Sequence, residues 1–303
     1  MKLLVTGSLF ATEQDVKDLE ALGHEVTLHP DERIPVKDPE QYEGLICNSL
    51  FHYCGHAGFD RVRYVQVTSA GLDRVPLDWI REQGITLRNA EGVYSAPMAE
   101  WTLMRILELL KHVPAGFRNQ LAGVYRKDRS WQELGGKNVL LTGFGAFGRE
   151  IAKRLKPFGA RLTVVNRSIK SDPNVDEFRP LSDLPALLPQ ADILILAIAL
   201  TPETRGLFGK ELLGSMKPGS FLINAARGPL IDENALIEAL QNGPLAAAAL
   251  DVFETEPLPK DSPLWTLENV LLSPHNSFSG EFNHERMMKL VLGNLKAYGA
   301  QQA

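Results

Sequence analysis

Residues 140–168 read LLTGFGAFGREIAKRLKPFGARLTVVNRS, and this stretch decides the fold of the chain. A short apolar run leads into a G-x-G-x-x-G loop, a helical pattern follows, and a β-rich run at 162–165 comes after it. Strand, glycine loop, helix and strand in this order are the context that a dinucleotide-binding fingerprint requires. A glycine turn without a ligand is the other interpretation, and the flanking elements make it the less favoured one.

The glycine loop is predicted to bind the cofactor's pyrophosphate. The first glycine permits the tight turn, the second lets the backbone approach the phosphates, and the third lets helix and strand pack closely. The helix N-terminus adds free N–H groups and the positive end of its dipole. The predicted cofactor-binding residues of this loop are Gly143, Phe144, Gly145, Ala146, Phe147 and Gly148.

The end of the second β-rich run bears on which dinucleotide is bound. Chains that bind NAD carry an acidic residue about 20 residues into the motif, where it contacts the ribose 2′-hydroxyl. Here the run ends at Asn166, followed by Arg167 and Ser168, with Lys170 close by. No carboxylate is present to repel a 2′-phosphate, and an arginine and a hydroxyl group can bind one. We predict a preference for NADP(H); NAD(H) is the alternative if Asn166 binds a plain ribose and Arg167 faces solvent.

The composition is typical of a soluble globular protein. The 303 residues are enough for two domains, and 44% of them are hydrophobic and 23% charged. A net charge of −5 without a basic block argues against nucleic acid as a partner. No apolar stretch approaches the length of a membrane span, and residues 1–7 are interpreted as a strand and turn rather than a signal peptide.

Two cysteines, Cys47 and Cys54, indicate a reducing compartment, so we expect a cytoplasmic protein without disulfides. They lie near His52 and His56, but the order of these four residues lacks the paired spacing of common zinc sites. We therefore predict no metal site.

Strands alternate with helices along the chain, which predicts parallel pairing and an α/β fold. The first third has the pattern of a small doubly wound domain of its own. Residues 97–111 then form a long helix that is apolar around more than one face. Such a helix is buried, either between domains or against a second subunit.

Three polar residues follow successive strands of the glycine-loop domain: Arg227, Glu256 and His275. In open α/β sheets the ligand crevice lies outside the carboxyl ends of the strands. The Arg227 guanidinium suits a carboxylate or a carbonyl oxygen, and histidine titrates near neutral pH. Glu256 can hold His275 and favour its charged form. Each residue alone also has a structural interpretation, and their combination beside a dinucleotide loop favours chemistry.

Several motifs resemble those of the D-isomer-specific 2-hydroxyacid dehydrogenases, and the likeness spans nearly the whole chain. The matching segments are SAGLD at 69–73, AE at 99–100, GFGAFG at 143–148, MKPGSFLINAARGPLID at 216–232, DVFETEP at 251–257 and SPH at 273–275. The part from 224 to 232 is highly specific for this family.

The resemblance implies an α/β fold of two Rossmann-like domains, each a doubly wound, mostly parallel sheet, with the cofactor domain inserted into the substrate domain. We expect residues 1–96 and 277–303 to form the discontinuous substrate domain and residues 97–276 the dinucleotide-binding domain. Members of the family usually form dimers through the cofactor domain and the long helix before it, so a homodimer is expected.

The resemblance also implies roles for the residues of the cofactor domain. Arg227 binds the substrate carboxylate and polarises the keto oxygen, and His275 is the general acid in reduction. Glu256 pairs with His275. Asp251 contacts the nicotinamide carboxamide, and Ala226 belongs to the cofactor-binding set.

On the substrate side, the resemblance implies that backbone N–H groups around Ala70 and Gly71 hold the substrate carboxylate. Asn48, Ser49 and Leu50 are expected to line the same side. The loop from 48 to 53 is more aromatic than a site restricted to glyoxylate needs, so the identity of the substrate stays open.

The expected activity is reduction of a small 2-keto acid, such as glyoxylate, hydroxypyruvate or pyruvate, to the D-2-hydroxy acid by hydride transfer from NAD(P)H. An arginine and a protonated imidazole would stabilise the charge that develops on the carbonyl oxygen. The alternative is a nucleotide-sensing, corepressor-like binding protein on the same fold, which would keep the same three residues. Formate oxidation is disfavoured because that subgroup has a glutamine where Glu256 stands. Phe278, shortly after His275, is a further departure from the small residues of many members.

Overall fold

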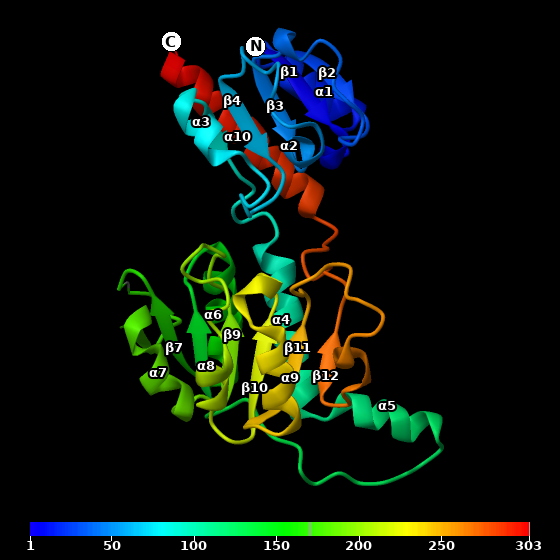
Figure 1. Cartoon of the computed structure of the whole chain (residues 1–303), viewed down its shortest axis with the longest axis vertical. Coiled ribbons are helices and arrows are strands. Elements are labelled where there is room, and N and C mark those ends of the chain that lie inside the picture. The colour runs from blue at the N-terminus through cyan, green and yellow to red at the C-terminus, as the bar shows by residue number, and fades with distance from the viewer. Residues whose placement is uncertain (170, 303) are drawn as a thin grey trace. The chain divides into compact units, whose positions relative to one another are not determined.

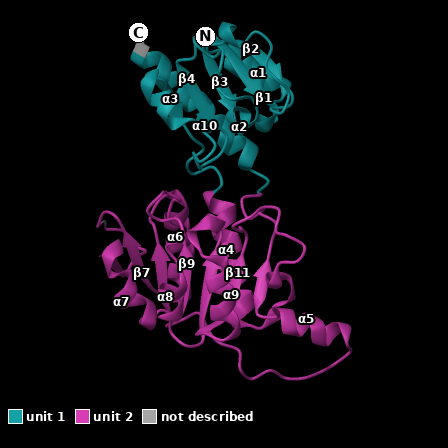
Figure 2. Ribbon diagram, viewed as in Figure 1, with its two compact units in different colours: residues 1–94, 280–303 teal, residues 95–279 magenta. Residues whose placement is uncertain are grey.

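The computed structural model describes residues 1–169 and 171–302, which form two compact units (Figure 2). Unit 1 comprises Met1–Tyr94 and Gly280–Ala303, and unit 2 comprises Ser95–Ser279. The boundaries expected from the sequence, 96/97 and 276/277, lie two to three residues from these. Each unit has its own parallel sheet and its own core.

Unit 1 is built on a five-stranded parallel sheet with the order β2-β1-β3-β4-β5. The strands are β1 (Lys2–Thr6), β2 (Glu25–His29), β3 (Gly44–Cys47), β4 (Tyr64–Val67) and β5 (Thr86–Arg88). The helices are α1 (Glu13–Glu20), α2 (Leu50–Cys54), α3 (Leu77–Glu82) and α10 (Asn283–Gln302). The strand order reverses between β1 and β3, and such switch points are where open α/β sheets bind ligands.

Helices cover both faces of the unit 1 sheet. α1 and α10 pack on one face, and α2 and α3 pack on the other. From the far end of the chain, α10 buries Met287, Val291 and Leu295 in the same core as Leu3 and Tyr64. Burial of each such apolar side chain contributes about 1.5–3 kcal/mol, so α10 belongs to the stable body of unit 1.

Unit 2 has a seven-stranded parallel sheet with the order β12-β11-β10-β9-β6-β7-β8 (Figure 1). The strands are β6 (Asn138–Thr142), β7 (Arg161–Asn166), β8 (Glu177–Pro180), β9 (Ile193–Leu196), β10 (Ser220–Asn224), β11 (Leu245–Leu250) and β12 (Val270–Leu272). The helices are α4 (Ser95–Leu110), α5 (Val113–Leu121), α6 (Ala146–Leu155), α7 (Leu184–Leu187), α8 (Lys210–Gly214) and α9 (Glu233–Gln241).

The layers of unit 2 follow from the burial of its strands. β9 and β10 are buried along their whole length, because helices cover both sides of them. α4 and α6 pack on one face, and α7, α8 and α9 pack on the other (Figure 1). α5 and the segment after it extend away from this body. The strand order of unit 2 reverses between β6 and β9, where the glycine loop begins.

The fold class predicted from the sequence is confirmed: the chain is α/β, with two doubly wound parallel sheets. Helix α10, from the end of the chain, packs on the first sheet. Unit 2 is therefore inserted into unit 1 along the sequence.

Candidate active site

The glycine loop joins β6 to α6 at the switch point of unit 2. Gly143 has a φ of 88°, and a Cβ there would lie 2.5 Å from the Ala197 carbonyl oxygen, so the position requires glycine. A Cβ on Gly148 would lie 2.5 Å from the Gly143 oxygen, so the third glycine allows α6 to pack close to the loop. A Cβ on Gly145 would meet no atom within 4 Å. The middle glycine therefore faces open space, which is the place for a phosphate in this motif.

The start of α6 has no side chain that caps it, since Gly145 occupies the N-cap position. The first N–H groups of a helix need an acceptor, and an anion at this end is stabilised by the dipole. The loop thus combines open space with unsatisfied donors, and it fits a dinucleotide pyrophosphate.

At the end of β7, Asn166 folds over the turn that follows it. Its side-chain amide donates to the Ser168 carbonyl oxygen at 3.0 Å and to the Ser168 hydroxyl at 3.3 Å. Arg167 and Ser168 are exposed. A hydrogen bond from Thr201 holds the pKa of Glu203 below its ordinary value, and the Arg167 charge adds to the effect. Lys170, named with these residues above, lies outside the described residues.

The turn after β10 presents Arg227. Asn224 is fully buried and shapes this turn, because its side chain accepts from the Ala226 N–H and donates to the Arg227 carbonyl oxygen, both at 3.0 Å. The Arg227 Nη1 donates to the Ala226 carbonyl oxygen at 2.8 Å. Asn224 is thus a structural turn residue.

A close backbone contact sets the turn at Arg227 against the loop after β11. A Cβ on Gly228 would lie 1.9 Å from the Phe253 carbonyl group, so glycine is needed for the two segments to meet. The Arg227 charge helps to lower the pKa of Glu256, although it is the last of several causes. The segment ARGP therefore fits against the segment DVFETEP.

His275 and Glu256 form the central pair of the site. The Nδ1 of His275 lies 2.6 Å from Glu256 Oε2, and the Phe253 N–H donates to Glu256 Oε1 at 3.1 Å. Burial raises the pKa of Glu256, but the bonds from His275 and Phe253 outweigh it, so the pKa lies below its ordinary value of 4.5. A carboxylate on Nδ1 fixes the imidazole so that Nε2 can act on a ligand. No hydrogen bond within the described residues occupies that Nε2.

The backbone of His275 is held in an unusual conformation by Asp251. His275 has a φ of 50°, which costs energy for a residue that is not glycine. Asp251 is fully buried, and its carboxylate accepts from the Ser273 hydroxyl at 2.6 Å, the Asn276 N–H at 3.0 Å and the Ser277 N–H at 2.9 Å. The Asp251 carbonyl oxygen accepts from the His275 N–H at 2.8 Å. Asp251 therefore supports the turn that carries His275; its contact with a nicotinamide remains a prediction.

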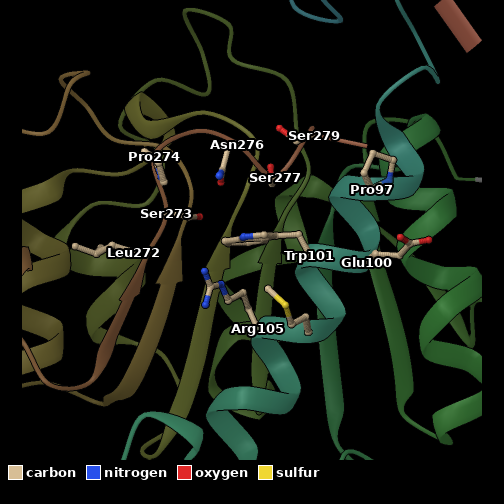
Figure 3. Close-up of a pocket in the computed structure, with 11 residues that line it drawn as sticks. Pro97, Glu100, Trp101, Arg105, Leu272, Ser273, Pro274, Asn276, Ser277 and Ser279 are labelled. Carbon is tan, nitrogen blue, oxygen red and sulfur yellow. The ribbon is translucent and has the colours of Figure 1, made fainter. Parts of the chain in front are cut away.

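A cavity of about 710 Å³ lies in unit 2 between α4 and the segment that carries His275 (Figure 3). Trp101 and Arg105 project from α4, while Pro274 and Asn276, the neighbours of His275, line the other side. Among the described residues, Trp101 Nε1 and Arg105 Nε are buried without a hydrogen-bond partner. α4 thus presents unsatisfied donors as well as apolar surface.

The residues expected on the substrate side all lie in unit 1, near the carboxyl ends of β3 and β4. Within the described chain, the N–H groups of Ala70 and Gly71 donate to no protein acceptor, so they are available to an anion. The side chain of Leu50 is wholly buried in the core, so only its backbone can face a ligand. The N–H groups of Asn48 and Ser49 are already bonded to a buried glutamate, Glu32.

A metal centre and a membrane-spanning helix would each need a feature that can be recognised in the structure. Nowhere in residues 1–169 and 171–302 do three or more His, Cys, Asp or Glu side chains gather as they would around a metal ion. Burial raises the pKa of the Cys47 thiol, and both cysteines are free. None of the helices in the same residues has the length and apolarity that a membrane crossing needs.

Comparison with known proteins agrees with this geometry. Residues 103–277 match the family described as D-isomer specific 2-hydroxyacid dehydrogenase, NAD binding domain. The chain belongs to the D-isomer specific 2-hydroxyacid dehydrogenases. The resemblance seen in the sequence is therefore confirmed, and the protein is an NAD(P)-dependent oxidoreductase of this family.

Individual relatives of this dehydrogenase extend the likeness over both units. The hydroxypyruvate reductase of Blautia hydrogenotrophica is 30% identical over 94% of this chain and 92% of that protein. The glyoxylate reductase of Pyrococcus furiosus is 35% identical over 78% of this chain and 73% of that protein. A solved D-isomer specific 2-hydroxyacid dehydrogenase from Xanthobacter autotrophicus Py2, in complex with NADPH and MES, is 30% identical and superimposes with a TM-score of 0.80 over 97% of this chain and 95% of that chain.

Proposed function

We propose that this dehydrogenase reduces a small 2-keto acid, of the glyoxylate, hydroxypyruvate or pyruvate type, to the D-2-hydroxy acid, with NADPH preferred over NADH. The observation that carries the proposal is the 2.6 Å pair between His275 and Glu256, with Arg227 at the end of a neighbouring strand. The residues follow β10, β11 and β12, which are adjacent in the sheet of unit 2.

In the proposed reaction, the carbonyl carbon of the keto acid accepts a hydride, which a reduced nicotinamide cofactor held at the glycine loop would supply. Arg227 binds the substrate carboxylate and the keto oxygen, where negative charge develops. His275 donates the proton on Nε2 to that oxygen, so the carbonyl becomes a hydroxyl group. Glu256 holds Nδ1 and stabilises the imidazolium before the transfer. In the direction of oxidation, the same imidazole accepts the proton.

The cofactor is proposed to bind along the strand ends of unit 2. The open space beside Gly145 and the uncapped start of α6 suit the pyrophosphate. Ala226 and Asp251 are proposed at the nicotinamide end. On the substrate side, the free N–H groups of Ala70 and Gly71 are proposed to hold the keto acid's carboxylate, with Asn48, Ser49 and Leu50 beside them.

The NADPH preference rests on Asn166, Arg167 and Ser168. Asn166 stands where chains that bind NAD carry an acidic residue, and Arg167 and Ser168 are exposed where a 2′-phosphate could be bound. The similar Xanthobacter enzyme was solved with NADPH, which supports the same choice. We expect kcat/KM to favour NADPH by roughly tenfold to a hundredfold, since one charge-assisted hydrogen bond contributes about 1.5–3 kcal/mol.

A double variant tests this preference. Asn166→Asp with Arg167→Ala places a negative charge near the 2′-phosphate and removes the guanidinium, so the order of the two cofactors should reverse. Equal use of both cofactors by the wild type would show that Arg167 does not bind the phosphate.

A homodimer in the cytoplasm is proposed as the working form. Phe117, Leu121, Tyr125 and Trp131 are exposed on α5 and the segment after it, and a second copy of the chain would bury them. The two free cysteines fit a reducing compartment. Sedimentation of wild type and Leu121→Glu tests the dimer, because a charge at an 87% exposed apolar position has no effect on a monomer.

The activity itself is tested with a panel of 2-keto acids and both reduced cofactors, followed by absorbance, with the chirality of the product determined by chromatography. Where the product of a small 2-keto acid has a chiral centre, we expect the D-2-hydroxy acid. Tight binding of NADPH with no turnover of any 2-keto acid would instead favour the nucleotide-sensing alternative.

A further inference from the structure

A buried carboxylate that the motifs do not mark holds the proposed substrate loop of unit 1. Glu32, in the loop after β2, is only 9% exposed. Its Oε1 accepts from the Asn48 N–H and the Thr6 hydroxyl, and its Oε2 accepts from the Ser49 N–H, each at 2.6 Å. A carboxylate satisfied by three donors is a costly arrangement to disturb.

Glu32 also ends a chain of hydroxyl groups across the edge of the sheet. The Thr6 hydroxyl donates its hydrogen bond to Glu32, so it must accept one from the Ser8 hydroxyl, whose oxygen lies 2.8 Å away. Ser8 in turn accepts from the Thr68 hydroxyl at 3.4 Å. The Glu32 carboxylate thereby sets the direction of each hydrogen bond in this series of hydroxyl groups. It links the ends of β1, β3 and β4, which are neighbours in the sheet.

The position of this network is the switch point of the unit 1 sheet, between β1 and β3, where a ligand crevice is expected. At that point the backbone donors of Asn48 and Ser49 are occupied by Glu32 and cannot bind an anionic substrate. The free donors lie one strand further along, at Ala70 and Gly71. In the described structure, Ala70 and Gly71 therefore offer backbone donors to the carboxylate of a keto acid, whereas Asn48 and Ser49 do not.

The loop is also held from its other side. The Arg74 Nη1 donates to the Ser49 hydroxyl at 2.9 Å, so both the backbone and the side chain of Ser49 are fixed. Residues held in this way keep one geometry when a ligand arrives, which reduces the cost of binding.

We infer that Glu32 is a positioning residue for the substrate: it fixes the Asn48–Ser49 segment so that the 2-keto acid binds in one orientation. This inference rests on the proposed function, because it requires the 48–50 segment to face a keto acid. Glu32 contacts neither substrate nor cofactor in this role. Its loss therefore weakens binding of the keto acid while binding of NADPH and the proton transfer at His275 are retained.

The test compares Glu32→Gln and Glu32→Ala with a matched control. Glutamine keeps the volume of the side chain but turns one acceptor oxygen into a donor, so one of the two loop N–H groups loses its partner. Glu43 provides the control, since its carboxylate also accepts a backbone N–H, that of Lys2 at 3.0 Å, at the amino end of β1. Glu43→Gln thus removes a comparable bond from the opposite edge of the same sheet.

For Glu32→Gln we expect the KM for glyoxylate to rise about tenfold, the equivalent of one lost hydrogen bond, with the KM for NADPH unchanged and kcat within about threefold. Glu32→Ala should raise the KM for glyoxylate further. Glu43→Gln should leave it unchanged, even where thermal unfolding shows an equal loss of stability. If Glu32→Ala does not fold, Glu32→Gln decides.

Two outcomes would overturn the inference while the proposed function stands. One is a folded Glu32→Gln variant with the wild-type KM for glyoxylate. The other is an equal rise in KM for Glu32→Gln and Glu43→Gln, which would mean a general loosening of unit 1. A wild type that reduces no 2-keto acid with either cofactor would overturn the proposed function, and the inference with it.

Discussion

The carboxyl edges of the two sheets present different chemical groups to the proposed ligand. In unit 2, the turns after β10, β11 and β12 present charged side chains, with His275 and Glu256 paired at 2.6 Å. In unit 1, the turns after β3 and β4 present backbone N–H groups, some of them bonded to Glu32 and others free. Both sheets are parallel and doubly wound, so the difference lies in the turns and not in the architecture.

In the proposed function, two copies of one architecture are divided between reaction and recognition. Proton transfer requires a side chain that can gain and lose a proton, and the unit 2 edge has His275 on a turn held by the buried Asp251. Recognition of a carboxylate requires only donors in fixed positions, which backbone groups provide. In each unit a buried carboxylate, Asp251 or Glu32, holds the segment that we propose faces the ligand.

Among conservative substitutions, the largest effect is expected from Arg227→Lys, which keeps the charge of the unit 2 edge and removes its two-pronged geometry. We expect kcat/KM for glyoxylate to fall about a hundredfold, with losses in both KM and kcat, because a lysine cannot form two parallel bonds. Steady-state kinetics measure this. Arg179→Lys, an exposed arginine of the same unit, is the control. Unchanged kinetics in Arg227→Lys would remove the arginine from substrate binding.

A smaller effect is expected from Glu256→Gln, which keeps the shape of the His275 pair and removes its charge. We expect kcat to fall about tenfold, and its decline with rising pH to begin at a lower pH, because no carboxylate stabilises the imidazolium. The pKa of Glu256 is lowered from 4.5, so its charge is present above that value and is lost only as the pH falls through the lower folded value. Rate profiles from about pH 5 to about pH 9 therefore compare a charged with a neutral partner throughout. Superimposable profiles would contradict the role of Glu256.

The smallest effect concerns stability in unit 1, at the start of α1. Asp15 accepts from the Thr12 N–H and hydroxyl at 2.7 and 2.6 Å, and lies 2.9 Å from His284 of α10. Burial raises the pKa of Asp15, but these bonds outweigh it, so the pKa lies below 3.8. The stabilisation is present above that pH and is lost as the pH falls through the lower folded value.

Asp15→Asn should accordingly lower the free energy of unfolding by about 0.5–1 kcal/mol at neutral pH. The difference from wild type should shrink toward zero in acid. Denaturant unfolding at neutral and acidic pH measures it, with Asp18→Asn, a half-buried residue of the same helix, as the control. A difference that persists in strong acid would mean that the charge of Asp15 is not its cause.

Much of unit 2 could be predicted because its constraints are local in sequence. Gly143 and Gly148 cannot carry a side chain, because other backbone segments pass close to them. The G-x-G-x-x-G motif already shows that glycine is needed at these two positions. Arg227 and His275 follow apolar strands directly, so their place at the sheet edge could be inferred from order alone.

The remainder depends on contacts between distant segments. Glu32 stands in an ordinary polar loop, and nothing in its neighbours indicates that it bonds to residues 48 and 49. The fixing of the turn at 273–277 by Asp251 joins segments more than twenty residues apart. Leu50 was expected beside a ligand, yet its side chain is buried, because helix α2 begins there and turns it into the core.

The most direct test of the division between the two edges is to measure kcat and NADPH affinity together in wild type and His275→Ala. We expect kcat to fall about a hundredfold or more, with the dissociation constant for NADPH within about twofold of wild type, because the proton donor is lost and the glycine loop is intact. His112→Ala, which breaks another histidine–carboxylate pair of unit 2, should leave both values unchanged. Near-normal turnover in folded His275→Ala would contradict the assignment of the chemistry to this edge.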